Sequence, residues 1–521
     1  MPTDNGKANL NAEEQSSEYL SSTSRRRLIG MAIGIVLFVV MLLSPPPATL
    51  SVEGWRVAAV GVLMAVFWVS EAMPLPVTAL LPLALFPLLG VGSIKSAAAH
   101  YANPVIFLFM GGFVVALAME RWRLHERIAL FVLRFVGNRM DYLVGGFMVA
   151  TAALSMWVSN TATTLMMLPI AISVVALYKE HAPQPAAGDL AGQQLFPSAL
   201  LLSVAYGATA GGMATLVGTP PNAFLAGFMR QTYGVEIGFA QWMTMALPLS
   251  ILLLVVIWWL ITRVVFKLKG RTIEGAQDLI RERAAGQGAM STGEVRVAIL
   301  FVLLATAWVL RPWISKLAPT LGLNDTVIAM IAAILAFMIP VDLKRGEFLM
   351  NWEWAQRLPF GVLILFGGGL SLAGAISETG LAEWIGAQLA VVGELPPVLI
   401  VMAMITVLIF LTELTSNTAT TAAFLPVVAA LAISLGEHPL LLVAPAALAA
   451  SCAFMLPVAT PPNAIVFASG HLGIGQMARA GLLLNIAAIF LITLIAYSAL
   501  LMVFGVQPGV LPEAIRAAVS K

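Results

Sequence analysis

Two short polar sequences occur twice in this chain, inside stretches that are otherwise apolar. Ser159–Ala162 (Ser-Asn-Thr-Ala) is followed by Thr219–Ala223 (Thr-Pro-Pro-Asn-Ala), and both sequences return at Ser416–Ala419 and Thr460–Ala464. Their hydroxyl and amide oxygens are neutral ligands that suit a hard monovalent cation. Helix ends beside them would offer unpaired backbone amides to an anion. The residue types therefore indicate a site that holds cations and a small carboxylate together.

Neither copy of these motifs is accompanied by Lys or Arg. The charge of a bound anion must then be balanced by co-bound cations and by the positive ends of helices. In an alternative interpretation, the small residues only allow helices to pack closely. Two copies with matched partner motifs favour a binding site over packing. Close packing is instead the interpretation we favour for the glycine runs Gly111–Gly112 and Gly367–Gly369.

Composition indicates the class of protein that carries these motifs. Hydrophobic residues make up 60% of the chain and charged residues only 10%, whereas about 25% of the residues in soluble domains are charged. Apolar stretches of about 20 residues, long enough to cross a bilayer, recur along the chain. Irregular backbone at membrane depth survives only where protein or a cavity surrounds it. Broken helices in duplicate are typical of secondary transporters.

The predicted fold is an all-α polytopic membrane protein with about 11 transmembrane helices and two re-entrant hairpins. The hairpins are expected at 140–178 and 395–436, and helices broken near their Pro-Pro pairs at 198–230 and 440–472. The predicted spans, the broken helices included, lie near 28–45, 55–73, 76–91, 103–120, 198–230, 243–266, 295–314, 324–341, 358–378, 440–472 and 479–505.

The two halves of the chain form a repeat. At a constant offset of 257, Ser155 falls on Thr412 and Ser159–Ala162 on Ser416–Ala419, and the offset then drops to 241. The polar segment Lys179–Gln194 explains the drop as an insertion in the first half. The expected units are a disordered cytoplasmic tail (1–27), a first repeat (28–266), a cytoplasmic linker (267–294), a second repeat (295–505) and an extracytoplasmic tail (506–521).

Basic residues predict the orientation of the repeats. Clusters at Arg25–Arg27, Arg121–Arg139, Arg263–Arg296 and Lys344–Arg345 all fall on the cytoplasmic side when the spans are counted. By contrast, residues 358–478 contain no Lys or Arg. The first hairpin is therefore expected to enter from the cytoplasm and the second from outside, as an inverted repeat. Compact loops and the lack of a targeting segment favour the bacterial inner membrane.

Ionisable side chains near the motifs are few. The only cysteine is Cys452 and the five histidines are scattered, so neither a disulfide nor a Cys or His metal site is expected. Glu413, beside the second motif, is either a proton-coupling group or a residue that orients the hairpin through hydrogen bonds. Its repeat partner is Met156, which favours the orienting role.

Both Ser-Asn-Thr signatures, both Thr-Pro-Pro-Asn turns and the inverted repeat resemble the divalent-anion:sodium symporter family over nearly the whole chain from about residue 28. The resemblance implies a protomer with scaffold and transport domains, a homodimer, and transport of the elevator type.

Site residues follow from the resemblance position by position. The first sodium site is expected at Ser155, Ser159, Asn160 and Gly218, and the second at Thr412, Thr415, Asn417 and Ala459, several of them acting through backbone carbonyls. The substrate carboxylates are expected to meet Asn160, Thr161, Ser416, Asn417 and Thr418, with Thr219 and Thr460 nearby.

The implied function is sodium-coupled symport of small dicarboxylates such as succinate, malate or fumarate, with at least two sodium ions. Alternatives inside the family are a sodium-independent dicarboxylate exchanger and a sulfate or citrate transporter. A channel would need a continuous polar pore, and an enzyme would need a nucleophile with a base, or metal ligands. Neither pattern is present in the sequence. The expected partners are the anion, sodium, the lipid bilayer and a second copy of the chain, without nucleic acid.

Overall fold

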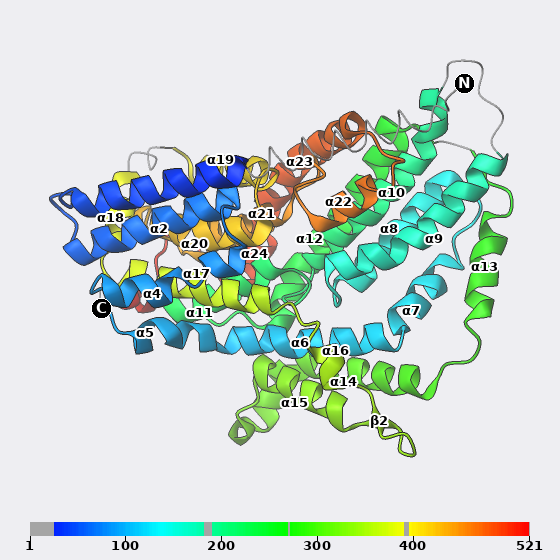
Figure 1. The fold of residues 1–521 in the computed structure, drawn as a ribbon, viewed down its shortest axis with the longest axis horizontal. Coiled ribbons are helices and arrows are strands. Elements are labelled where there is room, and N and C mark those ends of the chain that lie inside the picture. Colours follow the sequence, from blue (N-terminus) through cyan, green and yellow to red (C-terminus); the bar gives the residue numbers. More distant parts are fainter. Residues whose placement is uncertain (1–24, 182–189, 269–270, 390–394, 520–521) are drawn as a thin grey trace.

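The computed structural model describes residues 25–181, 190–268, 271–389 and 395–519 (Figure 1). Within these residues the regular secondary structure is helical apart from one short hairpin of β1 (Pro340–Asp342) and β2 (Glu347–Phe348). Ten of the described helices are long and apolar enough to cross a membrane, and five shorter apolar helices accompany them. The predicted all-α polytopic membrane fold is confirmed.

The first half begins with an unlabelled helix, Arg25–Leu43. The helices that follow it are α2 (Val52–Ser70), α3 (Leu75–Thr78), α4 (Leu81–Leu88), α5 (Ile94–Ala99), η1 (His100–Ala102), α6 (Pro104–Arg121), α7 (Leu124–Leu133), α8 (Met140–Ser155), α9 (Asn160–His181), α10 (Leu190–Gly212), α11 (Pro220–Tyr233), α12 (Phe239–Trp259), the π-helical turn η2 (Leu260–Val265) and α13 (Ala276–Gly286).

The second half repeats much of this order. Its helices are α14 (Thr292–Leu317), η3 (Pro319–Leu321), α15 (Asp325–Met338), α16 (Trp352–Ala355), α17 (Phe360–Glu378), α18 (Leu381–Leu389), α19 (Pro397–Thr412), α20 (Asn417–Ser434), α21 (Leu440–Ser451), α22 (Pro461–Phe467), α23 (Ile474–Ala496), α24 (Ala499–Phe504) and α25 (Glu513–Val519).

The segment predicted as one span near 76–91 is instead two short helices, α3 and α4. Pro76 and Pro82 stand in the first turns of these helices, where a missing N–H is tolerated, and Pro87 lies inside α4. Prolines at this spacing interrupt the backbone hydrogen bonds of a continuous helix. The apolar composition of the segment led to the prediction of one span, which is wrong because the prolines divide the segment into two helices.

Each half has a long helix that turns sharply into a short amphipathic one, α6 into α7 and α17 into α18. The turns lie at Arg123, with φ of 55°, and Gly380, with φ of 74°. These residues are 257 apart and therefore occupy equivalent positions in the repeat. A left-handed backbone is uncommon for a residue with a side chain, so Arg123 marks a bend that the surrounding fold imposes.

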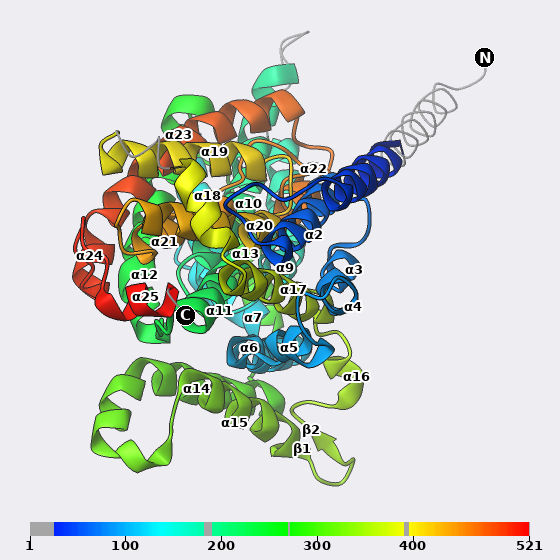
Figure 2. The ribbon, with the colours of Figure 1, turned by 90° about the vertical axis from the view of Figure 1, so that its left-hand side faces the viewer.

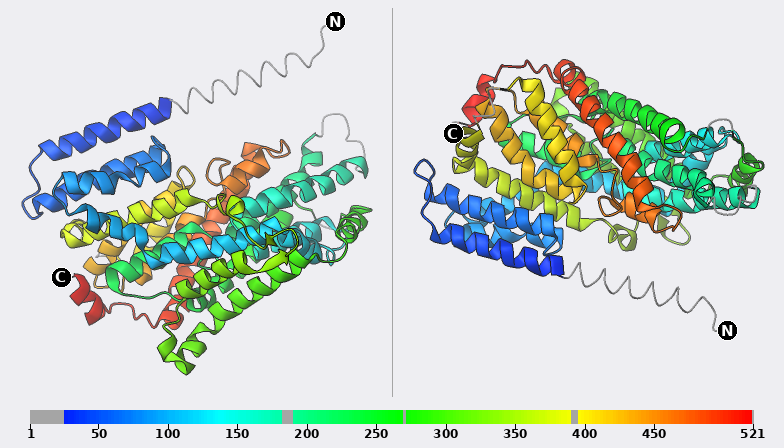
Figure 3. Two further views of the ribbon diagram at one scale, coloured as in Figure 1. Left: turned by 60° about the horizontal axis from the view of Figure 1, so that its bottom comes forward. Right: turned by 90° about the horizontal axis from the view of Figure 1, so that it is seen from above.

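The hairpins and broken helices of the two halves interlock. The first arm of each hairpin packs along the broken helix of its own half, α8 on α10 and α19 on α21. The second arms pack on the broken helix of their own half as well, α9 on α10 and α20 on α21, and they also contact the other half, α9 on α22 and α20 on α11. Around this interlocked unit, α14 and α15 form an outer layer beside α6 (Figure 2). The helix Arg25–Leu43 lies beside α2 at another edge (Figure 3).

A buried carboxylate fixes the base of the first hairpin. Asp141, in the first turn of α8, is fully buried, and its Oδ2 lies 2.9 Å from guanidinium nitrogens of both Arg139 and Arg263. The indole N–H of Trp258 donates to the Asp141 carbonyl oxygen at 2.8 Å. A buried charge is tolerated because these partners neutralise it, and together they join α8 to the end of α12.

We expect Asp141→Asn to lower the melting temperature of the detergent-purified protein by about 2–5 °C, because two guanidinium groups lose their shared counter-charge. Glu126→Gln is the matched control. Its partner Arg123 has a side chain that is 73% exposed, and exposed pairs contribute little to stability. Equal melting temperatures for the Asp141 variant and the wild-type protein would contradict this role.

Candidate functional site

Both hairpin tips contain the same hydrogen bond at equivalent positions. Ser155 Oγ donates to Asn160 Oδ1 at 2.5 Å, and Thr412 Oγ1 donates to Asn417 Oδ1 at 2.8 Å. The hydroxyl residues end α8 and α19, and the asparagines begin α9 and α20. Each tip therefore presents two neutral oxygens to the same small volume. Both oxygens would face a cation once the hydroxyl proton turned away.

In the first half, the break in the helix folds back against the tip. A Cβ atom on Gly212 would overlap the side-chain amide of Asn160, and one on Gly218 would overlap the backbone of Gly212. Glycine at both positions therefore permits an approach that any side chain would block. The predicted ligand Gly218 is brought close to Asn160 in this way.

In the second half, hydrogen bonds hold the tip against its break. Thr412 Oγ1 lies 2.8 Å from the Ala450 carbonyl oxygen, and Asn417 Nδ2 donates to the Ser451 carbonyl oxygen at 3.5 Å. The break from 452 to 460 continues from this helix end and contains the predicted ligand Ala459. Both predicted cation sets therefore combine one tip with one break.

Thr415 is the exception among the predicted cation ligands. Its hydroxyl bonds the Leu411 carbonyl oxygen at 3.0 Å and Thr420 Oγ1 at 2.6 Å. It is therefore not part of the bonded pair of Thr412 and Asn417, and its repeat equivalent Val158 has no hydroxyl at all. The hydroxyl of Thr415 is thus directed to α19 and α20 rather than to Asn417.

The asparagines of the two Thr-Pro-Pro-Asn motifs were not among the predicted site residues. Asn222 and Asn463 are fully buried. Their Nδ2 atoms donate at 2.8–3.4 Å to carbonyls of the preceding breaks: Asn222 to those of Gly212, Met213 and Thr215, and Asn463 to those of Ala453 and Leu456. Their repetition in the sequence was the available signal. They support the breaks through their Nδ2 atoms, and their buried Oδ1 atoms have no hydrogen-bond partner among the described residues.

Accessibility separates the predicted residues into two groups. The motif residues Ser159–Thr161 and Ser416–Thr418 are half-buried in both tips. The predicted ligands Ser155, Gly218, Thr412, Thr415 and Ala459, and the predicted neighbours Thr219 and Thr460, are buried. The motif residues are therefore more accessible than the other predicted ligands, although Ser159, Asn160 and Asn417 belong to the candidate cation sets as well. Thr460 Oγ1 also accepts from the Asn463 N–H at 3.3 Å, as the N-cap of α22.

The two combinations of tip and break are neighbours. Cys452 Sγ lies 3.9 Å from Met213 Sδ, which joins the two breaks directly. Tyr206, on α10 of the first half, donates its hydroxyl to the Phe454 carbonyl oxygen of the second break at 2.7 Å. The structure thus brings the two breaks together, and with them the candidate site residues that adjoin each break, in one region between the halves. Helices α9, α11 and α20 also begin in this region. The N-terminal end of a helix carries a partial positive charge and therefore favours anions.

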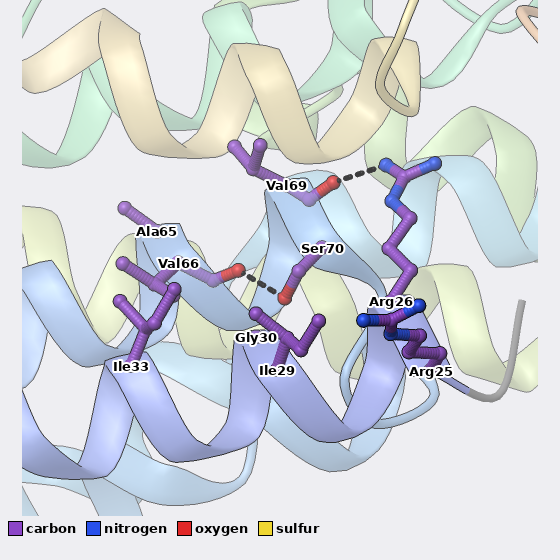
Figure 4. Close-up of a pocket in the computed structure, with 9 residues that line it drawn as sticks. All are labelled: Arg25, Arg26, Ile29, Gly30, Ile33, Ala65, Val66, Val69 and Ser70. Atoms are coloured by element: carbon purple, nitrogen blue, oxygen red, sulfur yellow. Dashed lines mark hydrogen bonds between the residues drawn. The ribbon is translucent and has the colours of Figure 1, made fainter. Parts of the chain in front are cut away.

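A cavity of about 620 Å³ lies elsewhere, between the helix Arg25–Leu43 and α2 (Figure 4). Its walls are apolar apart from Arg25, Arg26 and Ser70, and they contain none of the predicted site residues. Arg26 donates from its guanidinium to the Val69 carbonyl oxygen at 2.7 Å (Figure 4) and to that of Leu414, at the second tip, at 3.4 Å. The candidate anion site is therefore not this cavity.

Comparison with known proteins shows the fold and the family of this chain. A transporter from Alcanivorax borkumensis, YdaH, has a similar fold, with a TM-score of 0.54 over 93% of this chain and 98% of that one at 14% identity. The sodium-dependent dicarboxylate transporter SdcS of Staphylococcus saprophyticus is 42% identical over 513 residues, 96% of this chain and 98% of that protein. SdcS of Staphylococcus aureus is 42% identical over 486 residues, 93% of each chain. The model for the sodium:sulfate symporter transmembrane region matches residues 25–504, and this chain therefore belongs to that family.

Proposed function

We propose that this protein is a secondary transporter that couples sodium entry to uptake of small dicarboxylates of the succinate, malate and fumarate class. The observation that carries the proposal is the pair of equivalent hydroxyl–asparagine hydrogen bonds at the two tips. Relatives named for sodium-dependent dicarboxylate transport, 42% identical over almost the whole chain, support the same substrate and coupling ion.

Two sodium sites are part of this proposal. The first uses Ser155, Ser159, Asn160 and Gly218, and the second uses Thr412, Thr415, Asn417 and Ala459. Their contacts support this assignment, because each set joins an asparagine and a hydroxyl of a tip to a residue of a break. Such oxygens suit a hard cation. Two bound sodium ions would neutralise one dicarboxylate dianion.

The anion would lie between the two tips. Its carboxylates would meet Asn160, Thr161, Ser416, Asn417 and Thr418, with Thr219 and Thr460 nearby. The half-buried state of the motif side chains supports direct contact with a solute. Sodium would order the tips and so complete the anion site. The affinities for sodium and anion are then coupled reciprocally.

Elevator transport across the cell inner membrane completes the proposal, with a homodimer and a cytoplasmic N-terminus. The left-handed bends at Arg123 and Gly380 support it, because equivalent hinges would let α8–α12 and α19–α23 move together. Arg26 contacts Leu414 at the second tip. It lies in the first turn of the helix Arg25–Leu43, and the basic residues place the start of this helix on the cytoplasmic side. That contact supports an inward-facing arrangement.

We expect the purified protein in liposomes to accumulate labelled succinate when an inward sodium gradient is imposed, and not when potassium replaces sodium. Uptake that ignores sodium but requires internal dicarboxylate would make the protein an exchanger. Sodium-driven uptake of labelled sulfate that unlabelled succinate does not inhibit would replace the substrate class.

We expect Asn160→Ala and Asn417→Ala each to raise the sodium concentration for half-maximal uptake at least about tenfold, about 1.4 kcal/mol. Because the sites are coupled, the KM for succinate should rise as well. Asn351→Ala is the control, since Asn351 is exposed and caps the remote helix α16. Wild-type sodium activation in either asparagine variant would show that the assignment is wrong.

A further inference from the structure

One buried carboxylate near the proposed sites takes no part in the function described so far. Glu413 is 3% exposed and directly follows Thr412 in the chain. Its Oε1 accepts from the backbone N–H of Phe454 at 2.7 Å and of Met455 at 2.9 Å, and its Oε2 from those of Met455 at 3.0 Å and Leu456 at 3.1 Å. The Asn485 side chain donates to Oε1 at 2.8 Å.

The first half makes the corresponding connection without a charge. Met156 is the repeat equivalent of Glu413, and Thr215 is the equivalent of Leu456. Here the Thr215 hydroxyl donates to the Met156 carbonyl oxygen at 2.6 Å and accepts from the Gly218 N–H at 3.0 Å. In both halves the tip is tied to the same point of the break. The first tie is neutral, whereas the second uses a carboxyl group.

The hydrogen-bond geometry suits the ionised form of Glu413. Every partner described above is an N–H donor, and a protonated carboxyl would need an acceptor for its own proton. Hydrogen bonds from backbone amides to a carboxylate are among the stronger ones in proteins. The break from 452 to 460 is therefore held by a fixed negative charge, which stands one residue from the Thr412 ligand.

We propose that Glu413 is a positioning residue that makes the second sodium site stronger than the first. It acts in two ways: it sets the path of the break that contains Ala459, and it attracts the cation electrostatically without ligating it. The proposal rests on the proposed sodium-coupled function. It implies that the second site fills at lower sodium concentration than the first, so sodium enters the two sites in a preferred order.

The test is Glu413→Gln, measured in liposomes as uptake of labelled succinate against sodium concentration. The sodium concentration for half-maximal uptake should rise roughly tenfold, as expected for losing a charge near a cation in a partly desolvated site. At saturating sodium, the KM for succinate should stay the same or fall. The carboxylate of Glu413 repels a dianion in the wild-type protein, and the variant lacks this repulsion. A purely structural loss would instead raise both constants.

Glu413→Asp and Met156→Gln are the matched variants. Aspartate keeps the charge and should restore sodium activation to within about threefold of wild type, less than the tenfold change expected from the lost charge. Met156→Gln makes a neutral change at the equivalent residue of the first tip and should leave sodium activation unchanged. Wild-type sodium activation in Glu413→Gln would overturn the proposal. Equal shifts in the Gln and Asp variants would also overturn it, because shape rather than charge would then be responsible.

A binding measurement separates this proposal from the proposed function and applies to variants that transport poorly. Sodium should raise the melting temperature of the detergent-purified wild-type protein, and Glu413→Gln should need roughly tenfold more sodium for the same shift. If wild-type protein takes up succinate without sodium, the proposed coupling fails. If wild type depends on sodium and the variant has the wild-type sodium titration, only the role of Glu413 fails.

Discussion

Irregular backbone inside a membrane must find its hydrogen-bond partners within the protein, because lipid offers none. The two breaks, 213–219 and 452–460, depend on this constraint. Two carbonyls of each break accept from the buried amides of Asn222 and Asn463, and three N–H groups of the second break donate to Glu413. The polar motif residues thus have two roles. Some are candidate ligands, and others form the hydrogen bonds that stabilise the irregular backbone of the breaks.

The duplicated halves have kept their geometry and diverged in their electrostatics. The hydroxyl–asparagine pair of each tip is the same, as is the asparagine that holds each break. The tie between tip and break differs, since a neutral threonine serves in one half and a carboxylate in the other. An inverted repeat can therefore retain one architecture while its two halves acquire different electrostatics.

The short helices α7 and α18 connect the interlocked hairpins with the helices around them. Arg127 of α7 bonds Glu294 at the start of α14 at 2.8 Å, so α7 is anchored to the outer layer. At the other side of α7, Asp141 anchors the base of the first hairpin to the end of α12. Motion between the two units would then concentrate at the short connections rather than within either packed unit.

The sequence by itself determined the membrane class, the repeat and the hairpins' signature residues, because each depends on local composition or on a match at a constant offset. The candidate ligand sets came from the resemblance to a family, which equivalent positions of the repeat supported. It could not separate Asn222 from Asn160, since both are motif asparagines and only contacts distinguish a support from a ligand. Nor could it show that the hydroxyl of Thr415 turns toward Thr420. Only the tertiary structure identified the hydrogen-bond partners of Glu413, which lie 41 to 72 residues away. Such hydrogen bonds arise from how helices cross, and no local pattern specifies that crossing.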